Sequence, residues 1–128
     1  MTARLIVCTT CRYSEEDGAD VTGRSAGQAL RDLVAAVMER DDSGDLRLES
    51  QACLWACVSR CTIYLSAEGK PGYLAGRFMP DLANAEAIVD FARLYAATPQ
   101  GAVAYRDWPE GMKGRFIARL PAMNGTNR

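Results

Sequence analysis

The sequence predicts an α/β fold in which a βαβ unit is followed by a β-hairpin and a C-terminal helix on a mixed sheet. Three observations indicate this fold. Short aliphatic runs that suit strands stand before and after a segment of helical periodicity, turn residues separate two further strand-like runs, and a second amphipathic segment follows them. A chain of 128 residues can bury a substantial core, so we expect one domain over residues 1–128.

The first half of the chain carries the βαβ unit. A short aliphatic and β-branched run ends at Cys8 and fits a buried strand. Ser25 and Gln28 form a capping-box pair at the start of a helix whose apolar positions recur every three or four residues, until the turn at residues 41–44. Residues 46–50 alternate between apolar and polar and predict a second strand. These two strands should be parallel, with a right-handed crossover.

The second half predicts a hairpin, a helix and a tail. Residues 61–65 and 73–78 are strand-like, and the turn chemistry between them indicates an antiparallel hairpin. A second helix starts near Asp81 and presents one apolar face. In residues 98–128, aromatic and aliphatic side chains are dispersed among Gly and Pro. We expect this segment to be an extended tail packed on the domain, with little regular structure.

The chain has five cysteines and no histidine, and the cysteines form two groups. Cys8 ends the first predicted strand and Cys11 follows it, and Cys53, Cys57 and Cys61 follow the second. Ligands of open α/β sheets bind outside the carboxyl ends of the strands, so both groups should meet at one edge. Soft thiol ligands brought to one point favour a metal or iron–sulfur site.

The missing histidine excludes several kinds of chemistry. It removes Ser-His-Asp and Cys-His catalysis, histidine zinc sites and Rieske clusters. We therefore expect no enzymatic activity, since a reactive thiol would have only a carboxylate or a lysine as its base. A thioredoxin-type dithiol at Cys8 and Cys11 is the main competing interpretation. It requires a cysteine at a helix N-terminus, whereas a polar segment separates Cys11 from the predicted helix.

Net charge and apolar content indicate which partners and which cellular location to expect. The 15 basic and 16 acidic residues give a net charge of −1, so no polybasic surface indicates nucleic acid or an anionic membrane as a partner. The sequence starts without a signal-peptide pattern and contains no apolar stretch long enough to span a bilayer. We expect a cytoplasmic protein, because an odd number of cysteines also suits a reducing compartment.

The order of strands and thiols resembles the thioredoxin-like [2Fe-2S] ferredoxins. In these proteins one cysteine ends the first strand, a second lies in the following loop, and a Cys-x-x-x-Cys pair follows the second strand. The resemblance implies a thioredoxin-like fold, a [2Fe-2S] cluster, one-electron transfer to a reductase or oxygenase partner, and a homodimer. Carried over residue by residue, the ligands of the cluster metal are Cys8, Cys11, Cys53 and Cys57.

Two features depart from those ferredoxins. Their first two ligands are usually farther apart in sequence than Cys8 and Cys11, and they have no ligand that corresponds to Cys61. Cys61 is therefore an alternative ligand in place of Cys11, a spare thiol that allows ligand exchange, or a small buried residue at the start of a strand.

The whole chain also resembles a small bacterial family of unknown function, often described as predicted metal-binding proteins. The matching motifs are the Cys-Thr-Thr-Cys start, the segment from Cys53 to Thr62, and the Ala-Arg-Leu-Pro sequence at residues 118–121. This family is often associated with cobalamin-related genes, which implies an alternative function: a Cys-only zinc or cobalt-binding protein in metal handling. Zinc knuckles favour Cys-x-x-Cys in both halves, so the Cys-x-x-x-Cys spacing favours the iron–sulfur cluster.

Overall fold

The computed structural model describes residues 3–9, 25–41, 46–51, 61–98 and 103–121. The elements in these ranges are β1 (Ala3–Cys8), α1 (Ala26–Arg40), β2 (Leu46–Gln51), β3 (Ile63–Ser66), β4 (Gly72–Ala75), α2 (Leu82–Ala97), the short 3-10 turns η2 (Tyr105–Asp107) and η3 (Glu110–Met112), and β5 (Phe116–Leu120).

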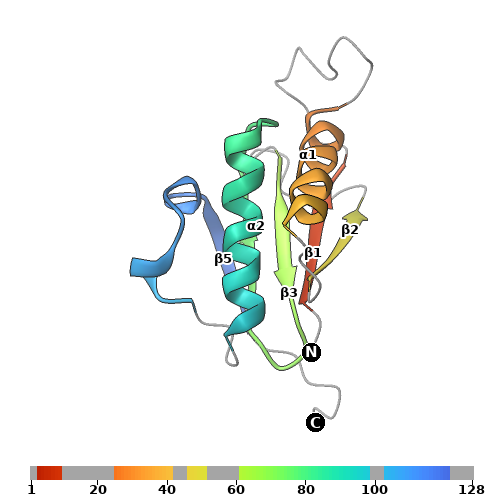
Figure 1. The fold of residues 1–128 in the computed structure, drawn as a ribbon. Coiled ribbons are helices and arrows are strands. Elements are labelled where there is room, and N and C mark those ends of the chain that lie inside the picture. Colours follow the sequence, from red (N-terminus) through yellow and green to blue (C-terminus); the bar gives the residue numbers. More distant parts are fainter. Residues whose placement is uncertain (1–2, 10–24, 42–45, 52–60, 99–102, 122–128) are drawn as a thin grey trace.

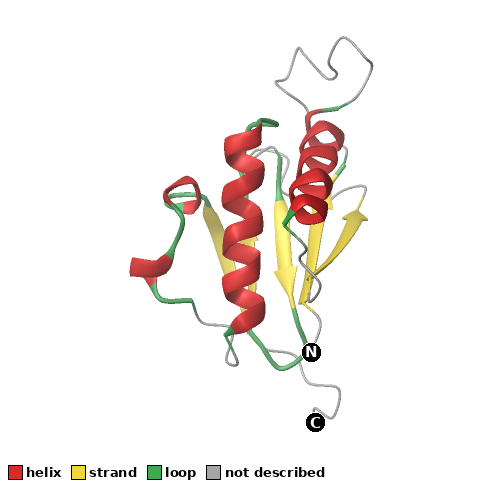
Figure 2. Ribbon diagram, viewed as in Figure 1, coloured by secondary structure: helices red, strands yellow, loops and turns green. Residues whose placement is uncertain are grey.

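The strands form one mixed sheet in the order β2-β1-β3-β4-β5. β1 and β2 are parallel, whereas β3 is antiparallel to both β1 and β4, and β5 is antiparallel to β4. This arrangement confirms the predicted βαβ unit and the hairpin on a mixed sheet. Figure 1 shows α1 and α2 side by side on one face of the sheet, and Figure 2 shows the same two layers by element type.

Both helices begin at the residues that the sequence indicated. The backbone N–H of Gln28 donates to the Ser25 hydroxyl at 3.1 Å, and the N–H of Asn84 donates to the Asp81 carboxylate at 2.8 Å. The Gln28 side-chain N–H group donates to the Asp32 carboxylate at 2.9 Å, one turn farther along the helix. Each cap satisfies a backbone donor that has no partner within its own helix.

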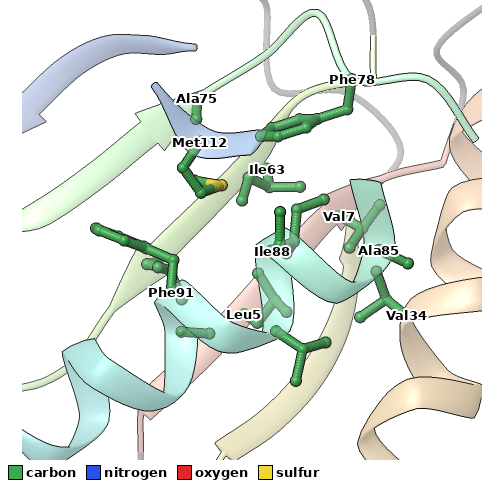
Figure 3. Packing of buried hydrophobic residues seen from close by; sticks show 14 of the residues in the cluster. Leu5, Val7, Val34, Ile63, Ala75, Phe78, Ala85, Ile88, Phe91 and Met112 are labelled. Atoms are coloured by element: carbon green, nitrogen blue, oxygen red, sulfur yellow. The ribbon is translucent and has the colours of Figure 1, made fainter. Parts of the chain in front are cut away.

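The core lies between the sheet and the two helices (Figure 3). Alternate residues of the central strands point into it, so that Leu5 and Val7 of β1 and Ile63 of β3 are almost completely buried. The helices cover them with Val34 of α1 and Ile88 of α2, both fully buried. Burying one such aliphatic side chain stabilises a fold by about 1.5–3 kcal/mol, so this layer supplies much of the driving force for folding.

The tail differs from the sequence-based expectation. Residues 98–128 were expected to have little regular structure, yet this segment contains β5, which extends the sheet beside β4. Aromatic packing explains the difference: the Phe116 ring centroid lies 4.7 Å from that of Trp108 and 5.1 Å from that of Phe91. A strand of five residues that is fixed by such long-range contacts has little local pattern in the sequence. The division into a domain and a tail stays a prediction.

The described helices carry no membrane-spanning segment, since neither is long and apolar enough to cross a bilayer.

The hairpin turn is tied to the C-terminal end of α2. The Lys70 ammonium is buried and donates to the carbonyl oxygens of Tyr95 at 3.0 Å and Ala96 at 3.1 Å, where a cation complements the helix dipole. In return the Tyr95 hydroxyl donates to the carbonyl oxygen of Pro71 at 2.8 Å. Burial lowers the pKa of Lys70 and raises the pKa of Tyr95 to about 12.

The raised pKa of Tyr95 predicts an alkaline loss of stability. The stabilisation is complete below the ordinary tyrosine pKa of 10.0 and is lost as the pH rises toward the folded-state pKa of about 12, by about 1.4 kcal/mol per pH unit. Tyr95→Phe removes this dependence and costs about 1 kcal/mol near neutral pH through the lost hydrogen bond. Urea unfolding of both proteins across this pH range should show the wild-type advantage shrinking above pH 10. Lys70 is common to both proteins, so parallel curves would contradict the assignment to Tyr95.

Candidate metal centre

Three strands meet at one edge of the sheet, and cysteines stand at this edge. β1 ends at Cys8, whose register partner is Gln51, the last residue of β2. The N–H of Cys8 donates to the carbonyl oxygen of Thr62 at 3.0 Å, and the N–H of Thr9 donates to that of Gln51 at 2.9 Å. Cys8 therefore lies between Gln51 and Thr62, and Cys61 is the residue immediately before Thr62. The exposed fractions of Cys8 and Cys61 are 4% and 2%.

This geometry brings two of the sequence-predicted site residues together. Cys8 lies at the carboxyl edge where the sequence placed it, and Cys61, considered as an alternative ligand or a buried residue, lies beside it. Cys11, Cys53 and Cys57 lie outside the described residues, so the complete ligand set stays a prediction. Among the residues that are described, no three His, Cys, Asp or Glu side chains gather as a metal site.

The N-terminus of α1 is held directly against Cys8. The Ser25 hydroxyl donates to the carbonyl oxygen of Thr9 while it caps the helix. A Cβ atom on Gly27 would lie 2.0 Å from the carbonyl oxygen of Cys8, so glycine is what allows the first turn to approach this closely. The positive end of the helix dipole therefore faces the edge that carries the thiols, and it favours negative charge there.

The same edge holds the strained backbone of the described chain. Cys61 and Arg77 have φ values of 43° and 64°, in the left-handed region that disfavours residues with a side chain. Cys61 stands two residues before β3 and Arg77 two residues after β4, and Ile63 pairs with Ala75 in the ladder between them. Both residues thus flank one end of the hairpin. Strain of about 1 kcal/mol or more per residue persists where surrounding contacts impose it, commonly at functional sites.

Two arginines add positive charge to this corner. Arg77 donates from its guanidinium to the carbonyl oxygen of Gly114, and Arg115 donates to that of Arg77. The Arg115 guanidinium also lies 5.1 Å from the centroid of the Phe78 ring. In the described ranges, no carboxylate pairs with either arginine. Arg77 could not be predicted from the sequence, because no local pattern marks an arginine as having a left-handed backbone.

The donor chemistry at this edge suits a metal held by thiolates. Two buried cysteines stand at this edge, Cys8 at the end of β1 and Cys61 two residues before β3, and the N-terminus of α1 lies against Cys8, where its dipole favours an anionic centre. Soft thiolate ligands suit zinc and iron–sulfur clusters alike.

The family DUF1636, a family of proteins of unknown function, matches residues 5–122 and so nearly the whole chain. The chain belongs to this family. The predicted membership of a family of unknown function is thereby confirmed. No curated protein is significantly similar to it in sequence.

The fold of this DUF1636 chain is similar to that of a thioredoxin-like [2Fe-2S] ferredoxin from Aquifex aeolicus. The TM-score is 0.52 at 15% sequence identity, over 70% of this chain and 77% of the ferredoxin. The likeness confirms the predicted thioredoxin-like fold. At this identity it shows the fold alone.

The close approach at Gly27 predicts whether a substitution there stabilises or destabilises this DUF1636 chain. Gly27→Ala should destabilise the fold by about 1–3 kcal/mol, because the added methyl group collides with the backbone of β1. The midpoint of urea unfolding measures this effect. Helix propensity alone favours alanine over glycine by about 1 kcal/mol, so a more stable variant would contradict the close contact.

Proposed function

We propose that this protein holds one [2Fe-2S] cluster and acts as a small ferredoxin-like electron carrier without chemistry of its own. The observation that carries the proposal is the placement of Cys8, buried at the carboxyl edge of the sheet and against the N-terminus of α1. The fold it shares with a protein described as a thioredoxin-like [2Fe-2S] ferredoxin supports it.

The proposed ligands are Cys8, Cys11, Cys53 and Cys57. When bound, such a cluster gains and loses single electrons. The burial of Cys8 suits a ligand that is shielded from water, and the helix N-terminus at Gly27 favours the negative charge that thiolates bring. We assign Cys61 to the wall of the site, where a small buried side chain packs beside Cys8.

The proposed partner is a redox protein, either a reductase that supplies electrons or an oxygenase that consumes them. The near-neutral charge of the chain does not favour nucleic acid or an anionic membrane. The homodimer implied by the ferredoxin resemblance stays a prediction, as does the cytoplasmic location.

Anaerobic purification tests the cofactor directly. An absorption spectrum and elemental analysis of one sample should show a brown protein with about two iron and two sulfide per chain. A colourless protein with about one zinc, or one that binds cobalt with thiolate charge-transfer bands, would overturn the cluster. The alternative function, a Cys-only zinc or cobalt protein in metal handling, would then take its place.

Serine variants test the ligand assignment. Cys53→Ser and Cys57→Ser should lose colour and iron, because each removes one thiolate from the cluster. Cys61→Ser is the matched control and should retain both, since its side chain is assigned to the wall. Iron content per folded chain, with folding checked by circular dichroism, measures the outcome. A full cluster in either of the first two variants would overturn the assignment.

A further inference from the structure

A small surface at the cysteine edge combines positive charge with exposed apolar side chains. It consists of Arg77, Met79, Leu82 and Gly114, here called the Arg77 surface. Arg77 is exposed, and the exposed fractions of Met79 and Leu82 are 57% and 51%. Gly114 faces open space, since nothing lies within 4 Å of where its Cβ would stand. These residues belong to two loops that follow β4 and precede β5 and to the first turn of α2.

The position of this surface follows from the strand directions. β1 and β4 are both antiparallel to β3, so they run in the same direction and their carboxyl ends share one edge. Arg77 follows the end of β4 as Thr9 follows the end of β1. Figure 1 shows that the N-terminal ends of α1 and α2 lie at this same end of the sheet. Whatever docks on the Arg77 surface is thereby brought to the side of the molecule that carries Cys8 and Cys61.

The Arg77 side chain is held in place before any partner binds. Its left-handed backbone is fixed between two contacts: its guanidinium donates to Gly114, and its own carbonyl oxygen accepts from Arg115. Neither contact neutralises the charge, because both acceptors are backbone carbonyls. A fixed guanidinium that pairs with no carboxylate of the described ranges loses little side-chain entropy on binding and can form a bidentate bond with a carboxylate of the partner.

We propose that the Arg77 surface docks an acidic face of a partner protein. The partner's role as the electron-exchange protein rests on the proposed function. The acidic chemistry rests on the charges of Arg77 and Arg115, which together exceed that of Asp81, the exposed carboxylate between Met79 and Leu82, whose Oδ1 accepts from the backbone and side-chain N–H groups of Asn84. An apolar centre of Met79 and Leu82 beside charged groups is the pattern of a protein interface. Nucleic acid would require a longer basic stripe than two arginines in a chain with a net charge of −1.

An acidic peptide serves as the probe. We would titrate the isotopically labelled full-length chain, as purified, with a short peptide of glutamates and leucines and follow the backbone amides by NMR. The expected shifts are confined to residues 76–82 and 113–115. Arg77→Asn should weaken binding about fivefold, the equivalent of about 1 kcal/mol for one partly exposed ion pair. Asparagine tolerates the left-handed backbone, and the Arg115 guanidinium can still donate to the carbonyl oxygen of this position, so the variant loses the Gly114 contact but retains the other contact that holds the loop.

Arg106→Asn is the matched control, because Arg106 is equally a charged and exposed residue but lies in η2. It should leave the affinity unchanged. If both variants bound the peptide equally weakly, or if the NMR shifts were spread over arginines elsewhere, the Arg77 surface would be overturned. Binding would then depend on net charge alone. If a DNA oligonucleotide or an anionic vesicle bound more tightly than the peptide and shifted the same amides, the proposal of a protein partner would be overturned. Iron and sulfide content is measured separately, so loss of the cluster proposal and loss of the docking proposal are distinguishable.

Discussion

The contact between the start of α1 and the end of β1 is the constraint on which the candidate centre depends. Gly27 lets the helix approach the carbonyl oxygen of Cys8, and Ser25 joins the helix cap to Thr9 by a hydrogen bond. This contact places positive potential from the helix at the residue where the first thiol stands. It also fixes how α1 lies over the sheet, since the first turn cannot shift without separating from the strand end. The packing of Val34 against the buried face of β1 follows from the same placement.

The two ends of the sheet have opposite physical characters. At the hairpin turn, the Lys70 ammonium donates to carbonyl oxygens at the end of α2, and the Tyr95 hydroxyl donates to a carbonyl oxygen of the turn. Both buried polar side chains therefore have hydrogen-bond partners. At the cysteine edge, Cys61 and Arg77 hold left-handed backbones, and in the described part of the chain the arginine charges contact carbonyl oxygens and the Phe78 ring but no carboxylate. A fold that is well satisfied at one end can tolerate strain at the other, because stability is a sum over the whole domain. The strained end is the one that carries the thiols and the positive charges able to bind a ligand.

Local patterns were sufficient to predict the parts of the fold that local physics determines. The cap at Ser25 is a bond between residues three apart, and the alternation over residues 46–50 reflects the two faces of a strand, so both are visible in the sequence. β5 was missed because its order comes from Phe116 packing against Phe91 and Trp108, contacts that are remote in sequence. Arg77 was missed for the same reason, since contacts with Gly114 and Arg115 impose its backbone. The cysteine edge was predictable because strand direction alone determines it, whereas the selection among five thiols depends on side-chain positions.

Placing the thiols and the proposed docking surface at the same edge of the sheet would suit electron transfer for a physical reason. A centre that is buried enough to be dry must still lie near the surface where its partner binds, and the carboxyl edge of a sheet offers both conditions. The strands supply the buried positions of Cys8 and Cys61, while the loops that leave the same edge supply exposed Arg77 and Met79. In the proposed carrier, positive groups there would act in two ways: they would favour an anionic centre, and they would attract a negatively charged partner over a Debye length of about 8–10 Å. On this proposal the same charges would serve both cluster binding and steering, and that double role would offset the backbone strain at Arg77.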